Sequence, residues 1–271
     1  MVPELALGTN HAYLDPRMRR AVRLLFLAFA VSLSMGATPA LANHSWGGYH
    51  WARPAGPFNP ALQLGDDVGS SWDAYLGDAS SDWSQSTSGN PVRTIVSTGF
   101  TTGRKCRGTS GRVEVCDARY GNNGWLGLAS IWLQGAHITR ATVKMNDTYF
   151  DTSTYNRANW RESVLCQEVG HVFGLDHQSE DPNVDRNTCM DYYRDPNLHP
   201  NTHDYEELAI IYAHGDAFTT IGATSSNRRS GSGLRRVRDS LFVEDLGDGK
   251  RRAVWVFWKD RGPHTAPPAG V

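Results

Sequence analysis

The stretch 166–177, with the sequence CQEVGHVFGLDH, constrains this chain more than any other part of it. Apolar residues recur there and just before it at helical spacing, and the pattern predicts a helix over about residues 159–173. Gly174 follows at the position where a glycine commonly ends a helix. A chain that bends at this glycine can bring the residues beyond it back toward one face of the helix.

Four polar side chains in this stretch predict a metal site. Gln167 and His171 are four residues apart, so in a helix they lie on the same face, one turn from each other. His177 can join them after the bend, and Glu168 lies at their flank. Three neutral ligands leave Zn2+ its full charge and an open position for a water molecule, which the metal acidifies. A carboxylate beside that water can take its proton while the water attacks a carbonyl group.

A methionine turn follows the stretch, in the sequence Cys189-Met190-Asp191-Tyr192. A methionine in a tight turn beneath a zinc site is a packing element and not a ligand. The two segments together resemble the metzincin zinc endopeptidases, whose pattern H-E-x-x-H-x-x-G-x-x-H is followed by a Met-turn. The spacing from His177 to Met190 is similar to that of the matrixin branch, and the resemblance covers roughly residues 137–213.

The resemblance implies a role for each of these residues. The zinc ligands would be Gln167, His171 and His177, and the general base would be Glu168. The Met-turn residue would be Met190, and Tyr192 would hydrogen-bond the developing oxyanion. It also implies a peptide substrate that binds in an extended form along an edge strand. The function expected is therefore that of a zinc metalloendopeptidase, in which metal-activated water hydrolyses peptide bonds.

The chain departs from the family pattern at Gln167, where the family has histidine. The amide oxygen of glutamine lies about as far from its backbone as the distal nitrogen of histidine, so the ligand geometry can be kept. Glutamine is also neutral, so the charge of the metal is preserved. Because an amide oxygen is a weaker zinc ligand than imidazole, we expect the zinc affinity to be lower by roughly one to three decades.

The pattern along the chain predicts an α/β (α+β) fold. Strands are expected over 62–64, 92–96, 129–133 and 141–145, and helices over about 68–83, capped by Ser70 or Ser71, and 204–212, capped by Asn201 or Thr202. The resemblance adds a zincin-like arrangement with a mixed twisted sheet, an active-site helix, a Met-turn and a C-terminal helix. Residues 241–243 and 254–258, separated by a Gly-Asp-Gly turn, are typical of a further hairpin.

The N-terminal 42 residues have the pattern of a secretory signal peptide. A basic cluster, a short apolar run over 24–31 and the sequence Ala40-Leu41-Ala42 follow one another in that order. A membrane anchor is the alternative. We therefore expect an extension and signal peptide over 1–42, a metzincin-like catalytic domain over 43–216, a linker over 217–233 and a hairpin segment over 234–271. The expected location is extracellular, with no membrane attachment after cleavage.

Four cysteines, Cys106, Cys116, Cys166 and Cys189, are an even number in a chain expected to be exported. Outside the cytosol they are expected to form disulfides, and three connectivities are open. A Cys106–Cys116 pair would close a short loop that could be the tip of a hairpin. A Cys166–Cys189 pair would pin the zinc helix to the Met-turn.

The charge balance limits the classes of partner. Lys and Arg number 27 and Asp and Glu 28, so the net charge of -1 gives no electrostatic case for a nucleic-acid binder. We expect a protein or peptide substrate, a monomer, and Zn2+ as the cofactor, with a structural Ca2+ ion to which the sequence assigns no ligands. His199 and His203 are either substitute ligands or surface and capping residues.

Two functions compete with the peptidase. The first is a catalytically silent metzincin-fold protein that acts as an extracellular binding module. The second is a carbohydrate or cell-wall binder, suggested by three tryptophans expected to be exposed, Trp46, Trp51 and Trp125.

Overall fold

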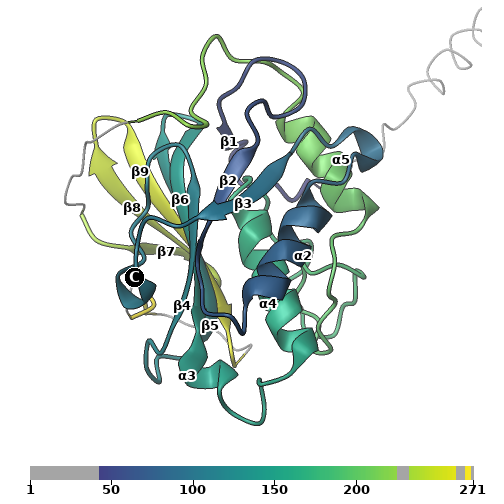
Figure 1. The fold of residues 1–271 in the computed structure, drawn as a ribbon, viewed down its shortest axis with the longest axis vertical. Coiled ribbons are helices and arrows are strands. Elements are labelled where there is room, and N and C mark those ends of the chain that lie inside the picture. Colours follow the sequence, from purple (N-terminus) through teal and green to yellow (C-terminus); the bar gives the residue numbers. More distant parts are fainter. Residues whose placement is uncertain (1–42, 225–231, 261–265, 270–271) are drawn as a thin grey trace, which may run out of the picture. The chain divides into compact units, whose positions relative to one another are not determined.

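Strands dominate the computed structural model of this chain, which describes residues 43–224, 232–260 and 266–269. They are β1 (His50–Trp51), β2 (Leu62–Asp67), β3 (Thr94–Thr98), β4 (Val113–Ala118), β5 (Trp125–Gln134), β6 (His137–Asn146), β7 (Arg235–Arg238), β8 (Leu241–Gly247) and β9 (Lys250–Trp258). Within the described residues they form one sheet in the order β3-β2-β4-β6-β5-β9-β8-β7, and β1 pairs with the start of β6 (Figure 1). The sheet is mixed, because β1 to β4 pair in parallel and β5, β7, β8 and β9 pair antiparallel with their neighbours.

The helices are few and the longer ones lie on one side of the sheet (Figure 1). They are α2 (Asp73–Trp83), α3 (Asp147–Phe150), α4 (Ala158–His171) and α5 (Thr202–Ile211), with 3-10 turns at Thr87–Gly89 and Gly103–Lys105. A mixed sheet with few helices confirms the α/β (α+β) expectation at this coarse level. Of the two predicted caps of α5, Asn201 is the one observed, in a reciprocal pair with Asp204. The predicted serine caps of α2 are wrong, because its N-cap is Trp72 and no side chain bonds there.

The core follows the two-residue period of the strands. On the helix-facing side, β5 and β6 contribute Ala129, Ile131, Ala141 and Val143 to the main apolar cluster. Alternate residues belong to a second cluster, whose members are Trp125, Leu128, Phe242, Val254, Val256 and Trp258. Both faces of β5 and β9 are therefore buried at this end of the sheet.

The strand β4 was not among the predicted elements. The segment before it was interpreted as the tip of a hairpin closed by Cys106 and Cys116. These cysteines do form a disulfide, but Cys116 lies inside β4, whose neighbours β2 and β6 both run parallel to it. The hairpin interpretation is therefore wrong, and the disulfide instead joins a central strand to the 3-10 turn at Gly103–Lys105.

The C-terminal hairpin is the feature that most affects the candidate site. β8 and β9 form the predicted hairpin, and β9 then pairs with β5 along nearly its whole length, from Trp125 to Gln134. Residues 44–271 accordingly form one compact unit, with the expected segments 43–216 and 234–271 sharing one sheet. Since β6 lies on the other side, β5 has a neighbouring strand on both sides.

Two further expectations can be compared with the structure, and a third falls outside the described residues. The disulfides pair Cys106 with Cys116 and Cys166 with Cys189, which is one of the three connectivities left open and fits an oxidising compartment. Among the described residues no helix has the length and apolar character needed to cross a membrane. The predicted signal peptide, residues 1–42, lies outside the described residues.

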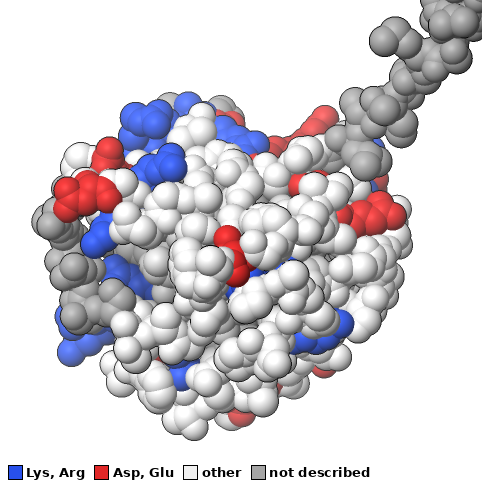
Figure 2. Space-filling model, turned by 90° about the horizontal axis from the view of Figure 1, so that it is seen from above, with Lys and Arg blue, Asp and Glu red and all other residues white. Residues whose placement is uncertain are grey.

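The surface does not support the carbohydrate-binding interpretation. Trp51 and Trp125 are fully buried, and Trp46 packs edge-on against Trp255 at 5.6 Å between ring centroids. Figure 2 shows one face of the molecule, on which acidic and basic side chains are interspersed. This face therefore presents no field of a single sign.

Candidate metal centre

α4 carries three of the predicted site residues on its last two turns, all of them buried. The Gln167 side chain is fixed by two hydrogen bonds from its Nε2, to the carbonyl oxygens of Cys189 at 2.6 Å and Asp191 at 2.9 Å. Because both partners can only accept, the amide nitrogen must face them. The Oε1 atom of Gln167 is thus left buried, with no hydrogen-bond partner among the described residues.

The bend after α4 brings His177 back to the helix. Gly174 has a φ of +96°, and a Cβ at this position would collide with the carbonyl oxygen of Tyr49, so only glycine fits. The Nε2 atoms of His171 and His177 then lie 3.0 Å apart, with the rings 4.6 Å apart and nearly perpendicular. The predicted convergence of these two histidines is present in the structure.

The other nitrogen of each ring is already engaged. His171 Nδ1 lies 2.9 Å from the carbonyl oxygen of Leu175, and His177 Nδ1 lies 3.2 Å from Oε1 of Glu180. The Leu175 carbonyl can only accept, so His171 Nδ1 carries the hydrogen and His171 Nε2 presents a lone pair to His177 Nε2. At 3.0 Å, His177 Nε2 can donate a hydrogen to that lone pair, or the two nitrogens can share a metal ion.

The pKa values of two groups around the histidine pair are shifted. Burial and the neighbouring His177 hold the pKa of His171 well below its usual range. Although burial alone raises the pKa of Glu180, its hydrogen bonds with His177 and Ser240 lower it overall, so this carboxylate is charged at neutral pH. Such outer carboxylate–histidine pairs are the usual support of zinc-ligating imidazoles.

Glu168 lies beneath the pairing of β5 with β9. Its carboxylate is fully buried, and neither oxygen has a hydrogen bond of ordinary geometry among the described residues. Burial raises its pKa well above the usual range, against an opposing effect of the backbone of Phe257 and Ala129. Gly127 makes room for this side chain, because a Cβ there would lie 2.7 Å from Glu168 Oε1.

Met190 packs under α4, as expected of a Met-turn residue. Its side chain is fully buried and touches the helix at Gly170, where a Cβ would clash with its sulfur. Cys189, the residue before it, forms the disulfide with Cys166 on α4. The turn is therefore tied to the helix both by packing and by a covalent bond.

β9 covers the site from the sheet side. The Trp255 ring stacks on His171 with centroids 5.1 Å apart and planes 12° apart. The Tyr192 ring lies 4.4 Å from that of His177, and its hydroxyl donates a hydrogen bond to the carbonyl oxygen of Val256. Tyr192 is thus at the site, with its hydroxyl turned to the covering strand.

Two polar contacts join the segment between β7 and β8 to the loop that carries His177. Arg238 at the end of β7 forms an ion pair with Asp176, whose Oδ1 also accepts from Trp255 Nε1 at 3.3 Å. Ser240 contacts Glu180 and lies 3.3 Å from His177 Nδ1. As a result the site is closed: the exposed fractions of Glu168, His171 and His177 are 0%, 1% and 7%.

The donor atoms at this site are of the kinds that zinc accepts. Two imidazole nitrogens lie 3.0 Å apart, and the buried amide oxygen of Gln167 has no hydrogen-bond partner among the described residues. His199 and His203 are not part of this group: His199 bonds Asp82 at 2.8 Å, and the His203 ring lies against that of His44. Their interpretation as substitute ligands is not supported.

No protein-family model and no curated protein matches the chain. The case for this site therefore depends on its own geometry.

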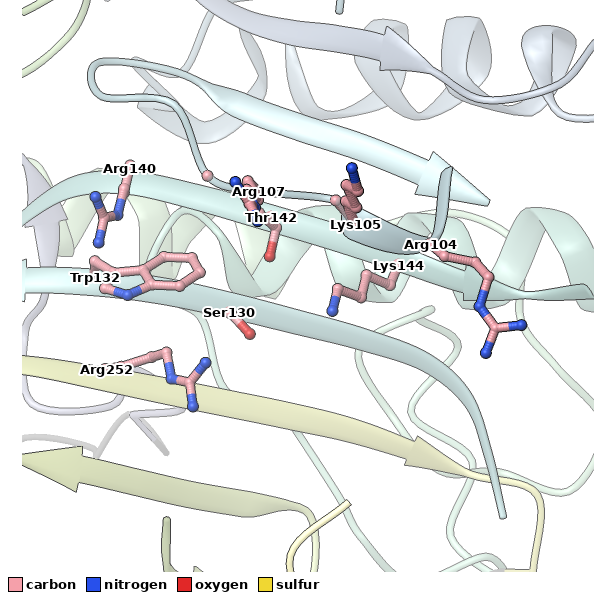
Figure 3. Close-up of a pocket in the computed structure, with 11 residues that line it drawn as sticks. Arg104, Lys105, Arg107, Ser130, Trp132, Arg140, Thr142, Lys144 and Arg252 are labelled. Carbon is pink, nitrogen blue, oxygen red and sulfur yellow. The ribbon is translucent and has the colours of Figure 1, made fainter. Parts of the chain in front are cut away.

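A basic cavity on the other face of the sheet was missed by the sequence analysis (Figure 3). It has a volume of about 340 Å³, and its described lining includes six cationic residues and no Asp or Glu: Arg104, Lys105, Arg107, Arg140, Lys144 and Arg252. Trp132 also lines it, with the guanidinium groups of Arg140 and Arg252 at 4.8 and 5.8 Å from the ring centroid. Such a cavity can attract an oxyanion.

The signal for this cavity was present in the strand pattern. Arg140, Thr142 and Lys144 alternate with the apolar residues of β6 and so share the face opposite the helices. Burial and the nearby Arg252 lower the pKa of Lys144 to about 8. Arg104, Lys105 and Arg107 come from the loop around the Cys106–Cys116 disulfide, and local periodicity could not place that loop over the sheet.

Proposed function

We propose that this chain is a secreted zinc-dependent endopeptidase of metzincin type, held closed by its own C-terminal hairpin. The observation that carries the proposal is the pair of Nε2 atoms 3.0 Å apart on His171 and His177, with the Nδ1 of each ring already engaged. Gln167 would supply the third ligand through its unpartnered Oε1. A bound zinc ion would acidify a water molecule and polarise the scissile carbonyl.

The chain's own residues would divide the remaining work. Glu168 has a raised pKa, which suits a carboxylate that takes a proton from water and passes it to the leaving amine. The Tyr192 hydroxyl would donate to the developing oxyanion once Val256 no longer accepts its hydrogen bond. The pairing of β9 with β5 supports an extended substrate, because an antiparallel strand already fits along β5 above Glu168.

One observation favours the alternative, a catalytically silent binding module of the same fold. Trp255 and Phe257 of β9 belong to the main apolar cluster, and both are almost completely buried. Removing β9 from β5 would expose these aromatic rings to water, which is costly. If β9 does not separate from β5, a zinc ion bound at the α4 site would be purely structural.

Weakening one ion pair between the C-terminal strands and the His177 loop tests the proposal without changing an apolar core residue. Arg238→Ala removes the ion pair with Asp176, whereas Arg236→Ala removes a pair with Asp239 in the segment from β7 to β8 and a longer-range charge effect on Glu180. The two arginine side chains have similar exposed fractions, 39% and 36%, so the second variant is a matched control. Zinc content and the cleavage of fluorescently labelled casein are measured for both variants and the parent.

We expect Arg238→Ala to cleave casein faster than the parent and Arg236→Ala to resemble the parent. Adding Glu168→Gln to Arg238→Ala should abolish the cleavage while the zinc content stays unchanged. Hydrogen exchange in β9 reports whether Arg238→Ala has loosened the strand. A loosened, zinc-loaded Arg238→Ala protein without cleavage that depends on Glu168 would reject the peptidase and favour the binding module.

A further inference from the structure

A second group of metal-binding side chains comes from elements other than α4. His50 on β1, and His214 and Asp216 after α5, converge at one place. His50 Nε2 lies 3.1 Å from His214 Nε2 and 3.6 Å from Asp216 Oδ2, and His214 Nε2 lies 4.0 Å from Asp216 Oδ1. Among the described residues, this is the one group of three or more His, Cys, Asp or Glu side chains whose donor atoms lie close enough to share an ion.

The hydrogen bonds around the group leave lone pairs directed inward. His50 Nδ1 lies 2.8 Å from the carbonyl oxygen of Gly48, so Nδ1 carries the hydrogen and Nε2 presents a lone pair. That lone pair faces a carboxylate oxygen of Asp216 at 3.6 Å. The same lone pair can accept a hydrogen from His214 Nε2 at 3.1 Å or, with the carboxylate and the second imidazole, ligate a shared ion.

The carboxylate is itself held in position. The backbone N–H of Arg53 donates to Asp216 Oδ2 at 3.1 Å, and His137 Nε2 at the start of β6 lies 3.1 Å from Oδ1. Each oxygen retains a further lone pair for an ion. Outer partners that fix a ligating carboxylate in this way are typical of metal sites.

We infer that His50, His214 and Asp216 bind a divalent transition metal, and we take Zn2+ as the probe. Two imidazoles and one carboxylate suit zinc, whereas Ca2+ and Mg2+ prefer sets made only of oxygen. The His50 and Asp216 side chains are 7% and 11% exposed, but that of His214 is 51% exposed, so the ion can enter from its side. The metal would clamp β1 to the segment that follows α5.

The site is independent of the proposed peptidase function, since it shares no residue with the α4 group. The test counts zinc in tag-free full-length protein, after the metal-free protein is loaded with Zn2+ and dialysed. His214→Ala removes a half-exposed ligand of the new site, and His177→Ala removes a ligand of the α4 site. His199→Ala removes a histidine that is 58% exposed and belongs to neither group.

We expect two zinc ions per chain in the parent and in His199→Ala, one in each of the other two single variants, and none in the double variant His177→Ala/His214→Ala. If the α4 group binds no zinc, the parent holds one ion and His214→Ala holds none, which still supports this site. Asp216→Asn should lose the same one zinc ion per chain as His214→Ala.

A second readout is the thermal midpoint. Added Zn2+ should raise it for His177→Ala, but not for the double variant, because an ion that binds only the folded chain stabilises it. Equal zinc content in the parent, His214→Ala and Asp216→Asn would overturn the inference and leave the group as a hydrogen-bonded network.

Discussion

Gln167 sets the expected zinc affinity of the α4 site. Its amide nitrogen donates to two carbonyl oxygens, which fixes Oε1 but leaves an amide oxygen as a weak ligand. Gln167→His should lower the zinc dissociation constant by about tenfold or more. The measurement is competition with a chromogenic chelator, in the His214→Ala background so that the second group does not contribute. An unchanged constant would mean that glutamine serves as well as histidine at this position.

Lys144 is expected to destabilise the fold near neutral pH. Its pKa is about 8 in the folded chain against about 10.4 in an unfolded one, so burying its charge costs about 3 kcal/mol below pH 8. Between pH 8 and 10.4 the unfolded chain binds more protons than the folded one, and the cost disappears as pH rises. Lys144→Met should therefore be more stable than the parent at pH 7, with a smaller difference at pH 9.5.

Urea unfolding of both proteins at the two pH values measures this difference. Sodium chloride is the suitable salt, because a phosphate or sulfate ion in the basic cavity would offset the charge of Lys144. A stability difference that stays constant with pH would show that the charge is already compensated.

The sequence was informative about residues whose positions depend on local geometry. The convergence of His171 and His177 follows from a helix and one glycine bend, both visible in the pattern. The partners that fix their tautomers, Leu175 and Glu180, are also close in sequence, but loop geometry decides their placement. The second group was missed because His50 and His214 are far apart in the chain and meet only through the fold.

Two helical glycines offer a matched test of packing at the scale of single elements. In α4, a Cβ on Gly170 would lie 2.6 Å from Cζ2 of Trp83 and would clash with Met190, whereas one on Gly77 in α2 meets nothing within 4 Å. Gly170→Ala should destabilise the protein by ~1–3 kcal/mol through overpacking. Gly77→Ala should stabilise it by ~0.5–1 kcal/mol through helix propensity. Chemical denaturation measures both, and equal effects would show that Met190 does not pack as described.

Helices and strands whose apolar residues recur at a clear period were predictable from the sequence, and the others were not. α4 and α5 have apolar periodicity and, for α5, a capping side chain at Asn201. β4 was missed because its residues flank a cysteine and were assigned to a loop. Its identity as a strand depends on β2 and β6, which lie on either side of it.

The two disulfides should differ in their effect on the whole molecule. Cys166–Cys189 spans 23 residues and joins α4 to the Met190 turn, whereas Cys106–Cys116 spans 10 residues beside the basic cavity. Replacing either pair with serine should cost about 3 kcal/mol. Only the loss of Cys166–Cys189 should also weaken zinc binding at the α4 site. Denaturation and zinc titration separate these effects, and equal zinc affinities would show that the packing of Met190 alone holds the turn.

The register of the sheet could not be predicted from the sequence. The hairpin of β8 and β9 is local and was expected, but its docking on β5 joins strands separated by more than a hundred residues. The continuous apolar run of β9 indicates a buried strand but does not indicate which strand it pairs with. The closure of the site is therefore a property of the tertiary structure alone.

The place of β9 near the end of the chain bears on the order of events during biosynthesis. A polypeptide leaves the ribosome from its N-terminus, so the ligands on α4 and after its bend emerge before the strand that covers them. Before β9 docks, the strand that buries these side chains in the folded chain is not yet in place. The proposed zinc ion would therefore have to enter before the last strand joins the sheet, or wait until that strand separates again.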